Sequence, residues 1–161
     1  MRLLLSLAGS LCLLAPTAQA QTPAAPPTFY STYTYTAYTV YDTTSAGPPT
    51  RVSGVGGTLT LRADGTYEKH LSIVASGTPH YFNQTGTFAL AGDSIRFAFS
   101  DLKGADVQRG TFRFVPTTRQ LTITILGYPS GNRGVYDLVA TPAKAPGKAP
   151  KPRPKAPARR K

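Results

Sequence analysis

Residues 28–41 read TFYSTYTYTAYTVY, a stretch in which tyrosine and threonine alternate almost without interruption and no charge occurs. Both residue types favour strands, where successive side chains point to opposite faces. One face of such a strand carries Phe29, Tyr33, Tyr35, Ala37 and Tyr41. Tyr38 and Val40 then fall out of phase, as they would after a β-bulge or a sharp bend. The stretch predicts a long barrel strand rather than an exposed adhesive tract, because an unpaired strand of this length would aggregate.

The same period of two continues to about residue 140. Short apolar runs are separated by turns such as ADG at 63–65 and AGD at 91–93, and no window has a helical period. Residues that share a face within a run are Leu59 and Leu61; Tyr67, Leu71 and Ile73; Phe82, Phe88 and Leu90; Ile95, Phe97 and Phe99; Phe112 and Phe114; and Leu121, Ile123 and Ile125. The pattern predicts an all-β fold, an antiparallel up-and-down barrel of about eight strands, with a two-sheet β-sandwich as the alternative.

Four stretches resemble one known family. They are GGTLTLRADGTYEKHLSI at 56–73, GTFALAGDSIRFAF at 86–99, GTFRFVPTTRQLTITI at 110–125 and VYDLV at 135–139. Together they resemble the small bacterial lipocalin-like (calycin-type) β-barrel domains, in which apolar strands alternate with D-G-T-Y and G-D turns. The resemblance implies a barrel that admits a small ligand at one open end. Such domains often have a tryptophan near the start of the first strand, and this chain has none.

The two ends of the chain differ from the part between them. Residues 1–20 combine a basic start, an apolar run and a small-residue end, which predicts a signal peptide and an exported, periplasmic or extracellular protein. The lone Cys12 lies inside this segment. Residues 21–27 resemble a linker, and residues 28–140 form the predicted barrel domain with nine basic and seven acidic side chains. Residues 141–161 are rich in Lys, Ala and Pro and lack large apolar residues, which predicts a disordered basic tail.

Lys69 and Gln84 fall on faces that otherwise carry large apolar side chains. Buried polar groups need partners, so these two either reach a mouth of the barrel or contact a polar group of a ligand. The predicted ligand-binding residues are Lys69, Gln84, Tyr33, Tyr35, Phe82, Phe97 and Phe112. The connection at 42–56 is the candidate loop over an open end. These observations favour a protein that binds a small apolar ligand.

Catalysis has little support in the sequence. The chain has two histidines and seven carboxylates, and it contains neither a G-x-S-x-G elbow nor a phosphate-binding glycine loop ahead of a helix. Glu68 and His70 share a strand face, but two ligands do not make a metal site. We therefore expect no enzymatic activity, no metal and no cofactor.

The tail supports an alternative function, in which an envelope-associated protein binds anionic surface polymers or lipid head groups. The candidate polyanion-binding residues are Lys144, Lys148, Lys151, Arg153, Lys155, Arg159, Arg160 and Lys161. Nucleic acid is not the partner we expect, because the tail has no aromatic side chain to stack on bases and an exported protein rarely meets nucleic acid.

Overall fold

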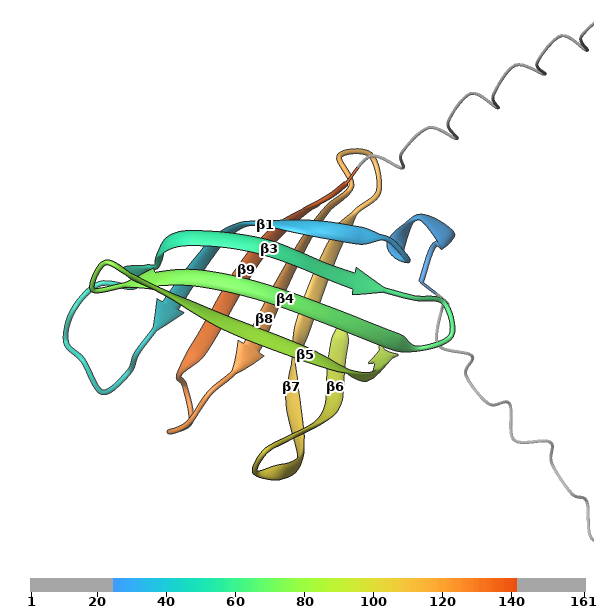
Figure 1. Cartoon of the computed structure of the whole chain (residues 1–161). Helices are drawn as coiled ribbons and strands as arrows, with labels where there is room; N and C mark the ends of the chain where they lie inside the picture. Colours follow the sequence, from blue (N-terminus) through green and yellow to red (C-terminus); the bar gives the residue numbers. More distant parts are fainter. Residues whose placement is uncertain (1–24, 142–161) are drawn as a thin grey trace, which may run out of the picture.

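The structure is a computed structural model that describes residues 25–141. It contains one short 3-10 helix and nine strands (Figure 1). Their bounds are η1 Pro27–Phe29, β1 Thr32–Tyr41, β2 Thr50–Arg51, β3 Ser53–Leu61, β4 Thr66–Ala75, β5 Thr78–Ala91, β6 Ser94–Asp101, β7 Gly104–Val115, β8 Gln120–Leu126 and β9 Arg133–Ala140. The predictions for residues 1–20 and for the basic tail concern segments outside the described residues. In the described part, no helix is both long enough and apolar enough to cross a bilayer.

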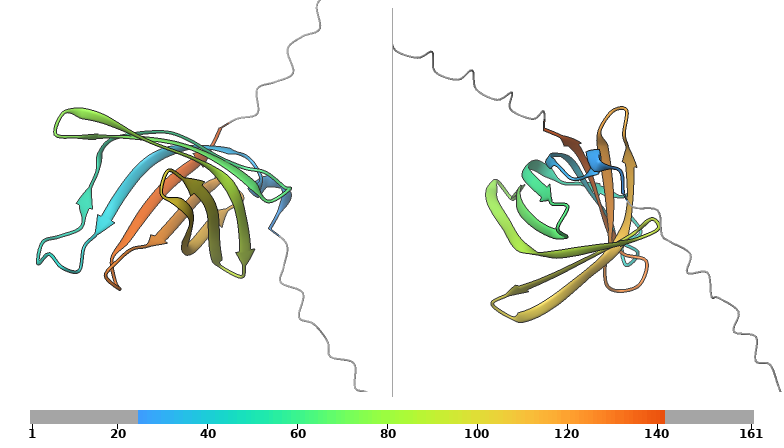
Figure 2. Two further views of the ribbon diagram at one scale, coloured as in Figure 1. Left: turned by 60° about the horizontal axis from the view of Figure 1, so that its bottom comes forward. Right: turned by 90° about the vertical axis from the view of Figure 1, so that its right-hand side faces the viewer.

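The sheet closes on itself to form a barrel. Consecutive strands from β3 to β9 are antiparallel neighbours, β1 pairs with β3 on one side, and β9 returns to pair with β1 from Tyr33↔Ala140 to Tyr41↔Arg133. Eight strands make the closed barrel, and the two-residue β2 adds only a short pairing to the end of β1. Figure 2 shows the strands curving around one interior. The predicted up-and-down barrel is confirmed, and the sandwich alternative is excluded by the β1–β9 pairing.

The out-of-phase residues of the first strand arise from a β-bulge. The pairing of β1 with β9 shifts register between Tyr35 and Ala37, which leaves Thr36 as the extra residue. After the bulge, Tyr38 lies opposite Tyr136 and stacks on its ring at a centroid distance of 4.3 Å. The bulge predicted from the sequence is therefore present. Placing Ala37 on the same face as Tyr35 was wrong, because the extra residue exchanges the faces beyond it.

One end of the barrel has a floor of aromatic side chains. Phe29 lies in η1 rather than in the first strand, which corrects the sequence prediction, and its side chain is fully buried. The helix begins with proline, whose fixed φ suits a first helical turn. The ring centroid of Phe29 lies 5.3 Å from that of Phe112 and 5.6 Å from that of Phe114, and Tyr33 donates a hydrogen bond from its hydroxyl to the Phe29 carbonyl. Phe29 therefore closes this end in a chain without tryptophan.

At the other end the barrel wall parts between β5 and β6. β5 pairs with β4 from its first residue, Thr78, to Thr87, whereas its pairing with β6 begins only at Gly86↔Phe99. Within the described part of the chain, residues 78–85 of β5 consequently have no strand on the β6 side. The tips of the β4–β5 and β6–β7 hairpins lie apart in Figures 1 and 2.

The connection after β1 is shorter than the predicted 42–56. β2 occupies Thr50–Arg51 and β3 already begins at Ser53, with a register shift between Ser53 and Gly56. Asn132 of the β8–β9 connection accepts hydrogen bonds from the backbone N–H of Thr43 at 2.7 Å and from its hydroxyl at 2.8 Å. The loop is thus tied to the β8–β9 connection at one side of the open end.

Gly86 allows β5 and β6 to approach closely where their pairing starts. A Cβ at this position would lie 2.1 Å from the carbonyl oxygen of Ala98. We expect Gly86→Ala to lower the free energy of unfolding by about 1–3 kcal/mol, because the strands would have to separate. Urea denaturation measures the change, and Gly47→Ala, where a Cβ meets only the Ser45 hydroxyl at 3.3 Å, is the matched control. Equal stability of the two variants would contradict the close approach.

Candidate functional site

The open half of the barrel contains two adjoining cavities. The inner cavity has a volume of about 30 Å³, and the outer cavity has a volume of about 400 Å³. Four residues, each from a different strand, line both of them: Lys69, Gln84, Gln108 and Tyr136. We call these four residues the polar belt. The belt separates the small space above the core from the larger space at the mouth.

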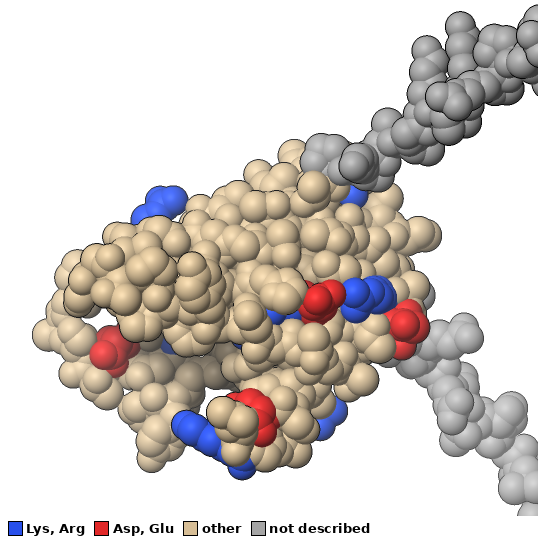
Figure 3. All heavy atoms as spheres, in the orientation of Figure 1, with Lys and Arg blue, Asp and Glu red and all other residues tan. Residues whose placement is uncertain are grey.

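The outer cavity opens where β5 and β6 part. Its apolar wall includes Leu71 and Ile73 of β4 and Phe82 of β5, and Asp101 at the end of β6 stands on the opposite side of the opening. Figure 3 shows a hollow on this face of the molecule, between the β4–β5 hairpin and the β6–β7 hairpin. The cavity can therefore be reached from the side of the barrel.

Strand register explains why the polar belt points inward. Lys69 of β4 lies opposite Leu59 of β3 and Gln84 of β5, and residues opposite each other in a sheet point to the same face. Gln108 of β7 lies opposite the buried Phe97 of β6, and Tyr136 of β9 lies opposite the buried Ile123 of β8. Each belt residue is therefore a polar side chain at an inward-facing position of its strand.

Lys69 brings a positive charge to the cavity wall. Burial lowers the pKa of its ammonium group from 10.5 to about 8, because the charged form loses water. The ion pairs found within residues 25–141 join Glu68 to Arg62 and to His70, and neither includes Lys69. Lys69 remains mainly protonated at neutral pH without a carboxylate partner in the described part of the chain.

Three tyrosines line the inner cavity together with Lys69. The Tyr67 side chain is 2 % exposed, and its hydroxyl is buried without a hydrogen-bond partner among the described residues. Burial raises the pKa of Tyr67 to about 12. It also raises the pKa of Tyr35 and of Tyr136, the latter helped by the neighbouring Tyr38. The three phenols that line the inner cavity, Tyr35, Tyr67 and Tyr136, therefore stay neutral in the physiological range.

The structure divides the seven predicted ligand-binding residues into two groups. Lys69, Gln84, Tyr35 and Phe97 line the inner cavity, and Phe82 lines the outer one together with Lys69 and Gln84. Tyr33 and Phe112 lie in the floor around Phe29 and line neither cavity. The eight candidate polyanion-binding residues lie outside the described residues.

Sequence reasoning missed Gln108 and Tyr136. A signal for Gln108 was present, because it is in phase with Phe112 and Phe114 of the same strand, β7. The stretch ahead of those phenylalanines looked like a connection, since it contains two glycines and an aspartate in GADVQRG at 104–110. Tyr136 could not be recognised from its own strand, because its place in the site depends on the β1 bulge, which brings Tyr38 opposite it.

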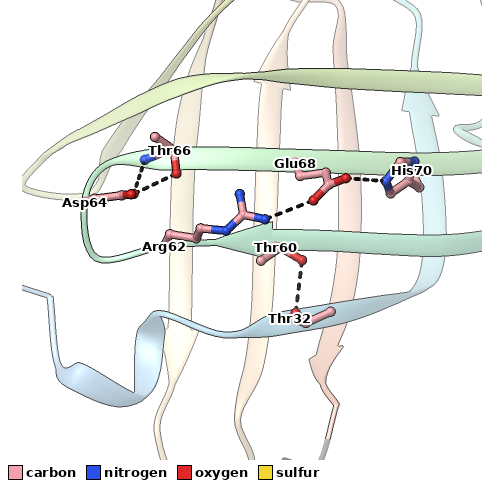
Figure 4. Close-up of polar contacts among 7 residues, drawn as sticks. All are labelled: Thr32, Thr60, Arg62, Asp64, Thr66, Glu68 and His70. Carbon is pink, nitrogen blue, oxygen red and sulfur yellow. Dashed lines mark hydrogen bonds and ion pairs between the residues drawn. The ribbon is translucent and has the colours of Figure 1, made fainter.

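The outer wall carries a separate polar cluster, shown in Figure 4. Glu68 accepts hydrogen bonds through both oxygens, at 2.9 Å from Arg62 Nη2 and at 2.9 Å from His70 Nε2. The pKa of the Glu68 carboxyl is lowered chiefly by the contact with His70, and the pKa of His70 is raised chiefly by Glu68. Within residues 25–141, no three His, Cys, Asp or Glu side chains gather closely enough to hold a metal ion. The cluster is a solvent-facing ion pair.

Fold and site together define the class of the protein: a closed eight-stranded antiparallel barrel with a packed floor and an open, partly polar cavity. This architecture is compatible with a lipocalin-like fold. A scan of protein-family models finds no match to the chain, and a comparison with curated proteins finds none either.

Proposed function

We propose that this protein is an exported, non-enzymatic barrel that binds a small ligand with an apolar body in its outer cavity. The observation that carries the proposal is the outer cavity itself, which has a volume of about 400 Å³ and is walled partly by Leu71, Ile73 and Phe82. Ligand pockets of this size are typically apolar with a few polar groups that fix orientation. Export rests on the signal-peptide pattern of residues 1–20.

The distribution of packing supports a binding role. The half of the barrel at the aromatic floor is filled by side chains such as Phe29, Leu61 and Leu121, each 1 % exposed or less. The open half is not filled in this way and contains the outer cavity. Eight-stranded barrels have an interior that side chains can fill or that can hold one small ligand. This barrel combines both arrangements along its axis.

The chemistry at the cavity supports binding rather than catalysis. The titratable groups that line the inner and outer cavities are Lys69, Asp101 and tyrosines. His70 instead faces solvent, where it contacts Glu68. The groups at the cavity are suited to holding and orienting a ligand.

We also propose that the chain belongs with the small bacterial lipocalin-like domains. The D-G-T-Y stretch at 64–67 covers the end of the turn between β3 and β4 and the first two residues of β4, as the resemblance implies. There Asp64 accepts hydrogen bonds from the Thr66 backbone N–H at 2.9 Å and from the Thr66 hydroxyl at 2.7 Å (Figure 4). The strand order and this turn support the assignment.

Nile red, a neutral dye whose emission rises in apolar surroundings, tests the binding function. We expect saturable binding of one dye per barrel, and at least about fivefold weaker binding to Phe82→Asp, because a charge would replace part of the apolar wall. Leu102→Asp is the matched control, since Leu102 is fully exposed in the β6–β7 turn and lines neither cavity. Absence of saturable binding, or equal affinities for both variants, would reject the outer cavity as a ligand site.

A second candidate function rests on the charge of the C-terminal segment. Residues 143–161 contain eight Lys and Arg side chains and no acid, a composition that attracts anionic envelope polymers or lipid head groups. We expect deletion of residues 143–161 to remove salt-sensitive binding to vesicles that contain phosphatidylglycerol. Unchanged vesicle binding by the deletion variant would dismiss this role.

A further inference from the structure

We propose that the polar belt, together with the Tyr67 hydroxyl, recognises the anionic head group of an amphipathic carboxylate, with Lys69 as its counter-ion. The apolar body of this ligand lies in the outer cavity. The inference rests on the proposed binding function and specifies its ligand class.

The charge at Lys69 is the first argument. A cation that leaves water is costly unless an opposite charge offsets the loss. No ion pair within residues 25–141 supplies that charge to Lys69, and no carboxylate lines the inner cavity. A ligand anion would provide the partner that the barrel wall lacks.

The Tyr67 hydroxyl is an independent argument. Almost every buried polar group in a folded protein has a hydrogen-bond partner, yet this hydroxyl has none among the described residues, although its side chain is 2 % exposed. Tyr67 lines the inner cavity together with Lys69, which lies two residues away on the inward face of β4. An acceptor placed in the inner cavity would meet both the ammonium and the phenol.

The remaining groups of the inner cavity complete a donor set. Gln84 and Gln108 carry amide NH₂ groups, which donate hydrogen bonds, and both side chains line the inner as well as the outer cavity. Hydrogen bonds to charged groups are roughly twice as strong as those between neutral groups. A carboxylate has two oxygens with which to accept them.

The size of the inner cavity favours a carboxylate over a bulkier anion. Its volume of about 30 Å³ accommodates roughly one or two water molecules. A single negative charge also matches the one lysine of the belt, whereas a phosphate dianion would add a second charge without a second cation. Asp101 at the outer opening disfavours a ligand whose negative charge remains near the rim. The head group is therefore expected at the belt and the tail toward the opening.

Isothermal titration calorimetry of the barrel with octanoate and with 1-octanol at pH 7 tests the inference. We expect octanoate to bind at least about tenfold more tightly than 1-octanol, which corresponds to one charge-assisted hydrogen bond. Lys69→Met should remove this preference by weakening octanoate binding. Tyr67→Phe should weaken octanoate binding severalfold. Lys103→Met is the matched control, because Lys103 is exposed in the β6–β7 turn and its loss should leave the preference unchanged.

The outcomes separate this inference from the binding function on which it rests. Equal affinities for octanoate and 1-octanol in the unaltered protein, or a preference that survives Lys69→Met, would overturn carboxylate recognition and leave the apolar binding function intact. Loss of the preference in Lys103→Met would assign it to surface charge and would also overturn the inference. Absence of binding by both compounds would refute the inference and the proposed function together.

Discussion

Phe29→Ala is expected to lower the free energy of unfolding by about 3–5 kcal/mol, the range typical for removing a buried phenylalanine side chain. Phe29 is fully buried, and its ring contacts those of Tyr30, Phe88, Phe112 and Phe114. Its removal would open a cavity between β5, which carries Phe88, and β7, which carries Phe112 and Phe114, and the closed barrel cannot readily collapse to fill it. Because domains are stable by only about 5–15 kcal/mol, this loss would be a large share of the total.

Urea denaturation followed by far-ultraviolet circular dichroism would measure this effect. Leu102→Ala removes an apolar side chain that is fully exposed in the β6–β7 turn, and its expected change is within about 0.5 kcal/mol. A loss below about 1 kcal/mol for Phe29→Ala would contradict the role of η1 as the closure of the barrel floor.

Lys69→Met is expected to have the opposite effect and to raise the free energy of unfolding at pH 7 by about 1–3 kcal/mol. The pKa of Lys69 falls from 10.5 to about 8 on burial, and each unit corresponds to 1.36 kcal/mol of preference for the neutral form. That difference sets an upper limit of about 3 kcal/mol for the cost of keeping the charge, and partial contact with solvent reduces it. Methionine fills a similar volume without the charge.

The stability that Lys69→Met gains over the unaltered protein should decrease as the pH rises. Between about pH 8 and pH 10.5 the unfolded protein keeps its proton on Lys69 while the folded protein loses it, so the stability of the unaltered protein rises with pH. The advantage of Lys69→Met should therefore be greatest below pH 8 and should shrink as the pH approaches 10.5. Burial also raises the pKa values of Tyr35, Tyr67 and Tyr136, so the protein loses stability above about pH 10. Both proteins contain these tyrosines, and their contribution to the free energy of unfolding cancels in the comparison.

Paired urea titrations at pH 7 and pH 9.5 would measure this difference. A variant that is less stable than the unaltered protein, or an advantage that does not change with pH, would contradict the unpaired charge at Lys69. A stabilised Lys69→Met variant would also show that any loss of octanoate binding arises from the missing charge and not from unfolding.

The sequence predicted the fold well where local patterns determine it. Alternation identified the strands, and the phase change at Tyr38 predicted the bulge that the pairing of β1 with β9 contains. The same reasoning placed Phe29 in the strand, because Phe29 lies four residues before Tyr33, and a spacing of four fits a period of two as well as a helical turn. The two prolines before Thr28, which favour the start of η1, were instead assigned to a linker.

The site was predicted only in part. Lys69 and Gln84 were recognised because each interrupts an apolar face, and both line the inner and outer cavities. The parting of β5 from β6 has no comparable local signal, since it depends on which residues of two strands pair. Tyr33 and Phe112 have the same alternating context as Tyr35 and Phe97, so periodicity alone could not assign them to the floor rather than to the cavity wall. Whether such a side chain lies in the floor or in the cavity wall depends on how far along the barrel axis its residue is placed.

The side opening between β5 and β6 bears on ligand length. A barrel entered only along its axis limits the whole ligand by its depth, whereas a slit in the wall allows a chain to pass outward between two hairpins. With the head group held at Lys69, the protein would distinguish ligands by their charged end and by the first carbons of the tail. Homologous carboxylates of increasing chain length should then reach a plateau of affinity instead of a sharp optimum.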